Sequence, residues 1–281
     1  MLFAQFNHLS VSRLILGSNP FSGFSHQNPQ TDWDMRHYFT SERIRAVFKD
    51  AEALGINTVI ARSDFHVMRI MLEYFDAGGS LQWFAQTCPE VGSHTACIQR
   101  ASTYGAKACH LHGGVMDNQF AQGKLDDVQP ALDLIREKGM LAGIAAHNPR
   151  VIAWAEEHLE LDYYLCCYYN PTPRDDRPEH VPGMREVYLE EDRQAMTDLI
   201  PQLSRPVVHY KILAAGRNDP AQAFAFAASK MRPNDAVCVG VYPKDRPQML
   251  AEDARLLEEC LASLTPTPAL PQSGGGRNIQ H

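Results

Sequence analysis

Eight stretches suited to β-strands follow one another in this sequence, and a helix-like stretch comes after each. Seven of them cover residues 13–18, 57–62, 81–86, 107–112, 141–147, 162–168 and 236–241, and one more lies within 206–217. The stretches between them carry apolar residues three and four positions apart, as at Ile44, Val47 and Phe48. Eight strand-helix units predict an α/β fold, a closed (βα)8 barrel of the TIM type. A dinucleotide-type glycine-rich turn, which would favour an open doubly wound sheet, is missing from the sequence.

The barrel is expected to occupy one domain, residues 1–264. Residues 1–12 contain two short alternating runs, which predict a hairpin closing one end of the barrel. Residues 24–40 lack a period and are interpreted as a long loop over the site, and residues 170–185 as a second functional loop. Residues 265–281 are rich in proline and glycine and are predicted to form a disordered tail.

The net charge and the cysteines indicate which partners and which cellular compartment suit this protein. The formal net charge of −7 argues against nucleic-acid and anionic-membrane partners, which need a basic face. The seven cysteines are scattered without a CxxC pair, as expected of reduced thiols in the cytoplasm. We see no signal peptide and no apolar run of about 18 residues. These features predict a cytoplasmic protein that acts on a small molecule, with its oligomeric state left open.

The stretch 206–217 suggests where the site lies. Side chains alternate along a strand, so His209 and Lys211 share one face and Val208 and Tyr210 the other. We expect the apolar face to contact the helices and the charged face to point into the barrel. Catalytic residues of such barrels come from the carboxyl ends of the strands.

Several strands end in polar side chains that the same alternation is expected to turn inward. They are Asn19 or Ser18, Arg62, Gln86, His110, His112, His147, Cys166, Tyr168, His209 and Lys211. Together they predict one polar pocket, in which Asn19, Arg62, Gln86, His147 and Tyr168 would contact the substrate.

Lys211 has two interpretations. A desolvated amine can serve as a base or as a Schiff-base nucleophile, and the alternative is a lysine paired with a carboxylate or with substrate. His112, His147 and His209 could ligate a divalent metal or could simply line a polar pocket with hydrogen bonds.

The second strand leads to another group of candidates. Asp64 suits a helix N-cap, and it also suits an acid, base or metal ligand. Arg62 is expected to grip a carboxylate or phosphate, or to hold Asp64 in place. His66 follows at the start of the helix, near the mouth of the pocket, and is expected to contact substrate.

Several motifs occur in the order found in the aldo-keto reductases. They are residues 11–23 (VSRLILGSNPFSG), 55–58 (GINT), His112, 147–149 (HNP), 169–171 (YNP), 239–240 (VG) and 252–253 (ED). The chain resembles that family over nearly the whole barrel, which implies the same fold.

The resemblance also implies that the chemistry has changed. The family's aspartate falls at Ile60 or Arg62, its tyrosine near Asp64, Phe65 and His66, and its lysine at Gln86. Only His112 matches, so the proton donor and the lysine that lowers its pKa are lost. For a bound NADP, the resemblance offers Arg217, Lys244 and Arg246 as phosphate contacts, although they could hold a substrate phosphate instead.

Three functions remain open. The first is an acid/base enzyme, a lyase, isomerase or aldolase-like catalyst, with Lys211, His112, His209 and Asp64 as catalytic residues and a metal as an option. The second is an NADP-dependent oxidoreductase with an altered set of catalytic residues and His112 as donor. The third is a sensor that binds a small molecule without turnover.

Overall fold

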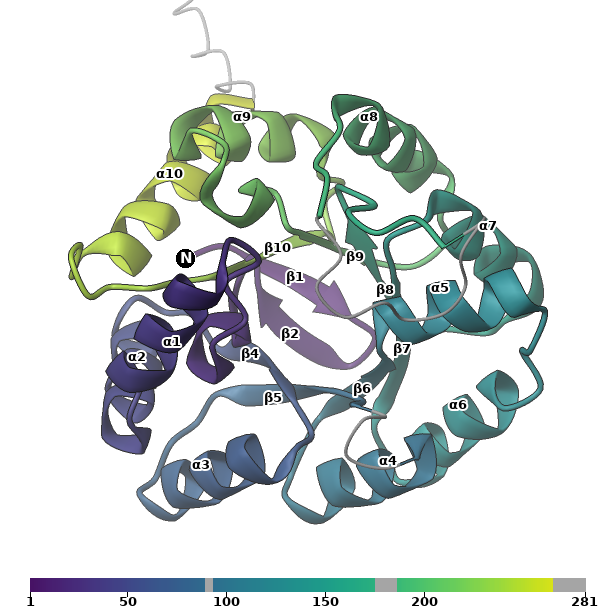
Figure 1. The fold of residues 1–281 in the computed structure, drawn as a ribbon, viewed down its shortest axis with the longest axis horizontal. Helices are drawn as coiled ribbons and strands as arrows, with labels where there is room; N and C mark the ends of the chain where they lie inside the picture. The colour runs from purple at the N-terminus through teal and green to yellow at the C-terminus, as the bar shows by residue number, and fades with distance from the viewer. Residues whose placement is uncertain (89–92, 175–185, 265–281) are drawn as a thin grey trace, which may run out of the picture.

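The structure of the protein is a computed structural model that describes residues 1–88, 93–174 and 186–264. Eight parallel strands close into a barrel in the order β10-β3-β4-β5-β6-β7-β8-β9. Figure 1 shows the helices arranged as a ring around these strands. The predicted α/β barrel is therefore confirmed. None of the helices in the described ranges is long and apolar enough to span a bilayer.

The bounds of the elements are as follows. The strands are β1 (Phe3–Phe6), β2 (Leu9–Ser12), β3 (Leu14–Gly17), β4 (Thr58–Arg62), β5 (Gln82–Gln86), β6 (Ala108–Leu111), β7 (Leu141–Ala146), β8 (Tyr163–Cys167), β9 (Val207–Tyr210) and β10 (Ala236–Gly240). The α-helices are α1 (Pro29–Tyr38), α2 (Ser41–Ala53), α3 (Phe65–Asp76), α4 (His94–Thr103), α5 (Gly113–Gln122), α6 (Val128–Glu137), α7 (Pro149–His158), α8 (Glu190–Leu199), α9 (Pro220–Lys230) and α10 (Met249–Leu264). Short 3-10 helices are η1 (Asn19–Ser22), η3 (Ile200–Gln202) and η4 (Ala214–Gly216).

Two helices occupy stretches without a clear helical period. The helix α1 lies within residues 24–40, where the side chain of Asn28 caps it by accepting the N–H of Thr31. Only Met35 of this helix is buried, so the sequence lacks the apolar stripe from which a helix is normally predicted. The helix α5 starts directly after His112, at a pair of glycines, a residue type that disfavours helices. The predicted tail 265–281 and most of the predicted loop 170–185 lie outside the described residues.

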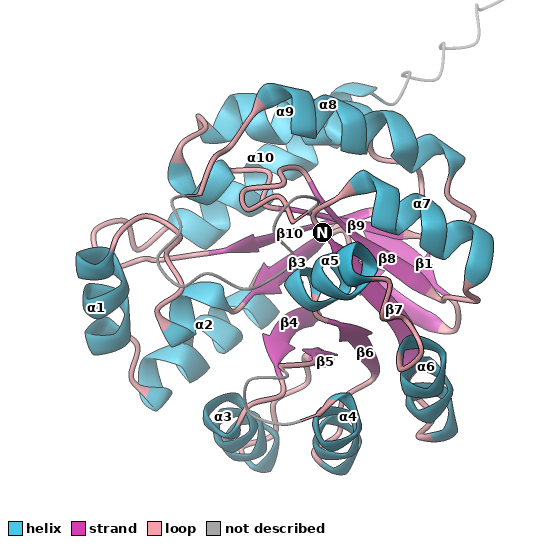
Figure 2. Cartoon of the chain, turned by 45° about the vertical axis from the view of Figure 1, so that its right-hand side comes forward, coloured by secondary structure: helices cyan, strands magenta, loops and turns pink. Residues whose placement is uncertain are grey.

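The N-terminal hairpin closes the amino end of the barrel, as the sequence predicts. Strands β1 and β2 pair antiparallel, and Phe6 and Val11 are fully buried. The ring of Phe6 lies 6.2 Å from that of Phe84 and 6.0 Å from that of Tyr163, measured between centroids. In Figure 1 the hairpin lies across the centre of the ring of helices, and Figure 2 shows the strands of the barrel from the side. Ligands are thus expected to enter at the opposite, carboxyl end.

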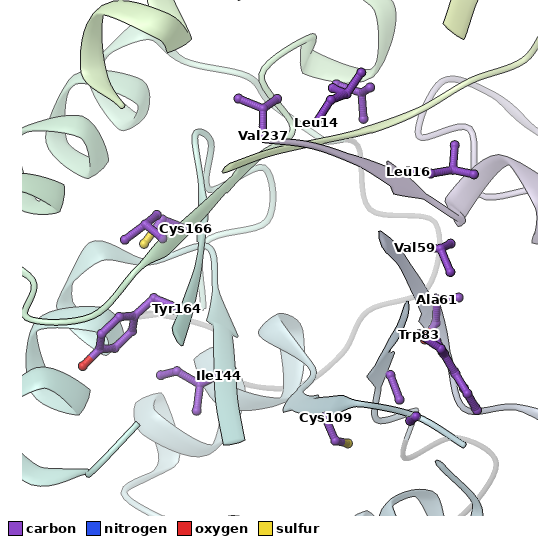
Figure 3. Packing of buried hydrophobic residues seen from close by; sticks show 14 of the residues in the cluster. Leu14, Leu16, Val59, Ala61, Trp83, Cys109, Ile144, Tyr164, Cys166 and Val237 are labelled. Carbon is purple, nitrogen blue, oxygen red and sulfur yellow. The ribbon is translucent and has the colours of Figure 1, made fainter. Parts of the chain in front are cut away.

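The faces of the barrel strands assign each side chain to one of two layers. Val208 belongs to the cluster inside the barrel, and Tyr210 packs against it. Cys166 pairs in register with His209, and Figure 3 shows Cys166 and Tyr164 on the outer side of the strands with the helix-facing residues. The inward placement expected for Cys166, Tyr168 and His209 is therefore wrong. Alternation correctly separated the two faces of β9 but could not tell which one the helices cover.

His209 is polar and fully buried because it has partners in the outer layer. Its Nδ1 lies 2.9 Å from the hydroxyl of Tyr168, and its Nε2 lies 3.4 Å from Oδ2 of Asp235. Asp235 also accepts the backbone N–H of Val207 at 2.9 Å and the Nε of Arg232 at 3.0 Å. This network ties β9 to the start of β10, which gives His209 and Tyr168 a structural role.

We expect Asp235→Ala to lower the free energy of unfolding by about 3–5 kcal/mol, because it leaves buried donors and Arg232 without their anion. Burial alone would raise the pKa of Asp235, but the contacts with His209 and Arg232 lower it to about 2, from 3.8. The carboxylate's stabilisation is thus present above pH 3.8 and is lost as the pH falls toward 2, a loss of about 2 kcal/mol.

Urea unfolding of wild type and variant at pH 7 and at pH 3 measures both effects. Asp133→Ala is the control, because this carboxylate is 64% exposed. Equal stability of the two variants at pH 7 would contradict the prediction.

Candidate active site

A cavity of about 570 Å³ opens at the carboxyl ends of the barrel strands. Ile60, Leu165 and Cys238 line its inner end, and Gly17 and Gly240 lie on its wall. It continues between α1 and the segment after β10. Of the residues predicted for the site, those that line it are Asn19, Arg62, Gln86, Lys211 and Arg246. The other strand-end residues predicted for this pocket do not line it; they are His110, His112, His147, Cys166, Tyr168 and His209.

A carboxylate and an imidazole form a dyad at the end of β7. The Nδ1 of His147 lies 2.7 Å from Oδ2 of Asp117, which comes from α5. Asp117 also accepts the backbone N–H groups of His147 at 3.1 Å and of Asn148 at 3.2 Å. Asp117 is 5% exposed, so its position is fixed. An imidazole whose Nδ1–H is held by a carboxylate has Nε2 available as a proton acceptor.

The Cε1–Nδ1 edge of the His147 ring lies toward Gly113 and Tyr210. Its Nε2 has no hydrogen-bond partner in the described ranges, and its side chain is 16% exposed. A Cβ at Gly113 would lie 3.1 Å from the ring of His147 and 3.1 Å from the hydroxyl of Tyr210. Glycine at this position thus lets the His147 ring and the Tyr210 hydroxyl approach each other. Burial keeps the pKa of Tyr210 well above its usual value, so its hydroxyl stays protonated.

His112 is held beside this dyad in its neutral form. Its backbone N–H donates to Oγ1 of Thr87 at 3.1 Å, and its Nδ1 is buried without a partner among the described residues. Burial lowers the pKa of His112 to about 3, with further lowering by His147, Arg62 and Lys211. A neutral imidazole can donate a hydrogen bond to a carbonyl oxygen or to an oxyanion.

Lys211 reaches the cavity through its backbone conformation. Strict alternation after Tyr210 would place residue 211 on the outer face with His209. Its φ of 58° is left-handed, the strand ends at Tyr210, and Lys211 lines the cavity. No described residue forms an ion pair or hydrogen bond with its amine. The alternation in the sequence predicts that Lys211 points into the barrel as part of a strand. The strand ends at Tyr210, and the left-handed backbone at Lys211 is what directs it to the cavity.

A second histidine-carboxylate pair joins two loops across the cavity. Nδ1 of His26, after β3, lies 2.7 Å from Oε1 of Glu186, before α8. Burial raises the pKa of Glu186, but the contacts with His26 and with the Lys211 charge outweigh it, and the pKa falls to about 2. The pKa of His26 is lowered, mainly by burial and then by Lys211. A neutral His26 thus donates to a carboxylate at neutral pH. His26 also has a left-handed φ, 57°, and such strain clusters at functional sites.

Arg62 and Asp64 are paired with each other. Nε of Arg62 lies 2.9 Å from Oδ2 of Asp64, while Oδ1 of Asp64 accepts the N–H of Val67 and caps α3. The structure thus supports the N-cap role and the Arg62 contact predicted for Asp64. His66 is exposed in the first turn of α3 and does not line the cavity.

The basic residues proposed for NADP do not gather on the cavity wall. Arg246 lines the cavity and pairs with Glu252, whereas Lys244 and Arg217 are outside the wall. The guanidinium of Arg217 lies 4.3 Å over the ring of Tyr188 and donates to the carbonyls of Ala214 and His26. Asp253, beside Arg246, is buried and its pKa is raised to about 7 by burial. Of the three basic residues, only Arg246 is placed to contact a phosphate inside the cavity.

The three imidazoles suggested as metal ligands do not share a point, because His209 lies in the outer layer. Within the described ranges no group of three His, Cys, Asp or Glu side chains is arranged to hold a metal ion.

Neither a known family model nor a curated protein sequence matches this chain. By structure it is similar to a protein assigned as an aldo-keto reductase from Pseudomonas aeruginosa, with a TM-score of 0.63, 13% identity, and coverage of 93% of this chain and 94% of that one. An aldo-keto reductase from Bacillus halodurans, in its holo form, is similar with a TM-score of 0.59 and 12% identity, and the match covers 97% of this chain and 99% of that one. A truncated 3-deoxy-D-arabino-heptulosonate 7-phosphate synthase from Thermotoga maritima is similar with a TM-score of 0.54 and 11% identity, and the match covers 94% of this chain and 93% of that one. The aldo-keto reductase-like barrel expected from the motifs is confirmed as a fold.

Four residues of this site were missed by the sequence reasoning: Asp117, Tyr210, His26 and Glu186. Asp117 lies in the unexpected helix α5, and Tyr210 was assigned to the opposite face. His26 lies in the segment 24–40, which was interpreted as a loop, and Glu186 directly follows the predicted loop 170–185. The one available signal was the series of histidines at strand ends, because a histidine in such a position is often oriented by a carboxylate partner.

Proposed function

We propose that this protein is an enzyme that transfers protons on a small, oxygenated, anionic substrate bound at the mouth of the barrel. The observation that carries the proposal is the Asp117–His147 dyad, whose second ring nitrogen is unpartnered among the described residues. The ring of His147 lies 6.0 Å from that of Tyr210, and Tyr210 lines the cavity together with Lys211. A buried carboxylate that orients an imidazole is the usual arrangement for a general base working near neutral pH.

The neighbouring groups suit the charge that such a reaction creates. Removal of a proton from the carbon next to a carbonyl by Nε2 of His147 leaves an enolate oxygen. The ammonium group of Lys211 and an N–H of neutral His112 would stabilise that oxygen. Return of the proton to a different atom completes an isomerisation, and departure of a group from the next carbon completes an elimination. The same amine also suits a Schiff base with the carbonyl, the aldolase-like version.

Carbon–hydrogen exchange tests the proposal without knowledge of the product. Wild-type protein is incubated in D2O with a panel of small oxo-acids, hydroxy-ketones and their phosphates, and loss of the adjacent proton signal is followed by 1H NMR. We expect exchange for at least one member. Binding of panel members without exchange would point to the sensor, and exchange that persists in His147→Ala would refute the base assignment.

An oxidoreductase is the second candidate, because the cavity extends from the barrel mouth past α1 toward α10 and the fold is that of aldo-keto reductases. Gln86 and Ile60 at the places of the family's lysine and aspartate weigh against it. Titration with NADPH, followed by nicotinamide fluorescence, separates the two. No binding at high micromolar cofactor would remove this candidate.

A further inference from the structure

Two cysteines lie in contact behind the site, and the mechanism above uses neither. Sγ of Cys88, just after β5, lies 3.9 Å from Sγ of Cys97 in the first turns of α4. Both residues are fully buried. A disulfide needs an S–S distance of about 2.05 Å, so a movement of roughly 2 Å would join them. Side-chain rotation together with a small shift of the backbone at Cys88 would cover that distance.

The surroundings of Cys97 favour a thiolate. Its Sγ accepts the backbone N–H of Cys88 at 3.3 Å and lies 3.6 Å from Nη2 of Arg100. As a thiol, Cys97 also donates to the Cys88 carbonyl at 3.4 Å, a contact that opposes ionisation and that the two donors must outweigh. The residue also lies near the amino end of α4, where the helix dipole stabilises negative charge. Hydrogen bonding from the Cys88 thiol lowers the pKa of Cys97 most, against the effect of burial, while the pKa of Cys88 is raised. The two thiols thus differ, one as nucleophile and one as partner.

We propose that Cys88 and Cys97 form a redox site, in which a peroxide converts the two thiols to a disulfide. The Cys97 thiolate attacks one oxygen of hydrogen peroxide, an S–O bond forms, the O–O bond breaks and hydroxide leaves. The Cys88 sulfur then attacks the sulfenic sulfur of Cys97, an S–S bond forms, and the S–O bond breaks as Cys88 loses its proton and water departs. Two thiols are oxidised, one peroxide is reduced, and two waters form in total.

The pair is connected to the cavity by two buried hydroxyl groups. Oγ of Ser63 lies 3.7 Å from Sγ of Cys88 and donates to the carbonyl of Gln86 at 3.0 Å. Thr87, next to Cys88, accepts the backbone N–H of His112. Movement of the Cys88 sulfur toward Cys97 breaks the Ser63 contact and shifts the chain at Thr87. Oxidation is therefore expected to loosen the support of His112 and Gln86.

The test is made on the full chain. Wild-type protein is treated with hydrogen peroxide, alkylated, digested and mapped by mass spectrometry. We expect a Cys88–Cys97 crosslink, an intact mass lower by two hydrogen atoms, and reversal by dithiothreitol. Amide exchange of His112 should be faster in the oxidised protein, because its acceptor Thr87 has shifted. Persistence of both thiols while the half-exposed Cys260 is oxidised would overturn the proposal.

Variants identify which thiol reacts. Cys88→Ser should accumulate a sulfenic acid at Cys97 that dimedone traps, and Cys97→Ser should leave Cys88 reduced. Cys260→Ser is the control and should form the crosslink at the wild-type rate. Dimedone labelling of Cys88 in Cys97→Ser, at a rate similar to that of Cys97 in Cys88→Ser, would refute the assigned order. The wild-type map remains decisive if either variant folds poorly.

Discussion

Asp117→Asn should slow the proposed carbon–hydrogen exchange by about 10²–10⁴-fold while the barrel stays folded. Asparagine keeps the shape of the side chain and one oxygen for the backbone N–H groups of His147 and Asn148. Its NH2 group, however, would donate to Nδ1 of His147, so the ring proton would move to Nε2. His147 would then have no lone pair directed at the substrate.

The exchange rate in D2O measures this effect, and circular dichroism checks the fold. Asp133→Asn provides the control, since Asp133 is exposed on α6 and changes the charge equally. An Asp117→Asn protein with a wild-type exchange rate would show that the dyad is only structural.

Lys211→Met should lower the exchange rate by roughly 10²–10³-fold, the cost of removing one group that stabilises a developing oxyanion. Methionine matches the length of the lysine chain, so the cavity keeps its shape and loses a charge.

Steady-state exchange kinetics and borohydride trapping distinguish a Schiff-base role of Lys211 from a purely electrostatic one. A fall in the maximal rate with a borohydride adduct at Lys211 in the wild type indicates a Schiff base, and the same fall without an adduct indicates a cation. Lys124→Met, on an exposed residue at the end of α5, should retain full activity. A Lys211→Met protein that loses only affinity would assign Lys211 to binding alone.

The sequence was sufficient for the barrel because its signals are local. The alternation of strands and helices depends on neighbouring residues, and so do helix starts such as Asn148-Pro149 and Asp219-Pro220, where Asn148 and Asp219 cap α7 and α9 in the structure. The part of the polar cluster that lines the cavity follows from the barrel geometry itself. Gln86 and Arg62, for example, pair in register and both line the cavity.

The remaining features depended on tertiary contacts. His209 faces the helices because Asp235 and Tyr168 contact its ring nitrogens there. Nothing near position 209 in the sequence indicates these partners. Lys211 enters the cavity through a left-handed φ that residue type alone does not predict. Asp117 was missed because a pair of glycines opens α5, where glycine usually argues against a helix.

The pairing of β3 with β10 has a consequence for synthesis of the chain. Leu14 lies in register with Val237, so the earliest barrel strand obtains its second neighbour only from the latest one. Until β10 has left the ribosome, β3 keeps an open edge and Phe6 and Val11 have an unfinished wall to pack against. A nascent chain stalled before residue 236 should therefore depend on chaperones, and release of the last strand should complete folding in one late step.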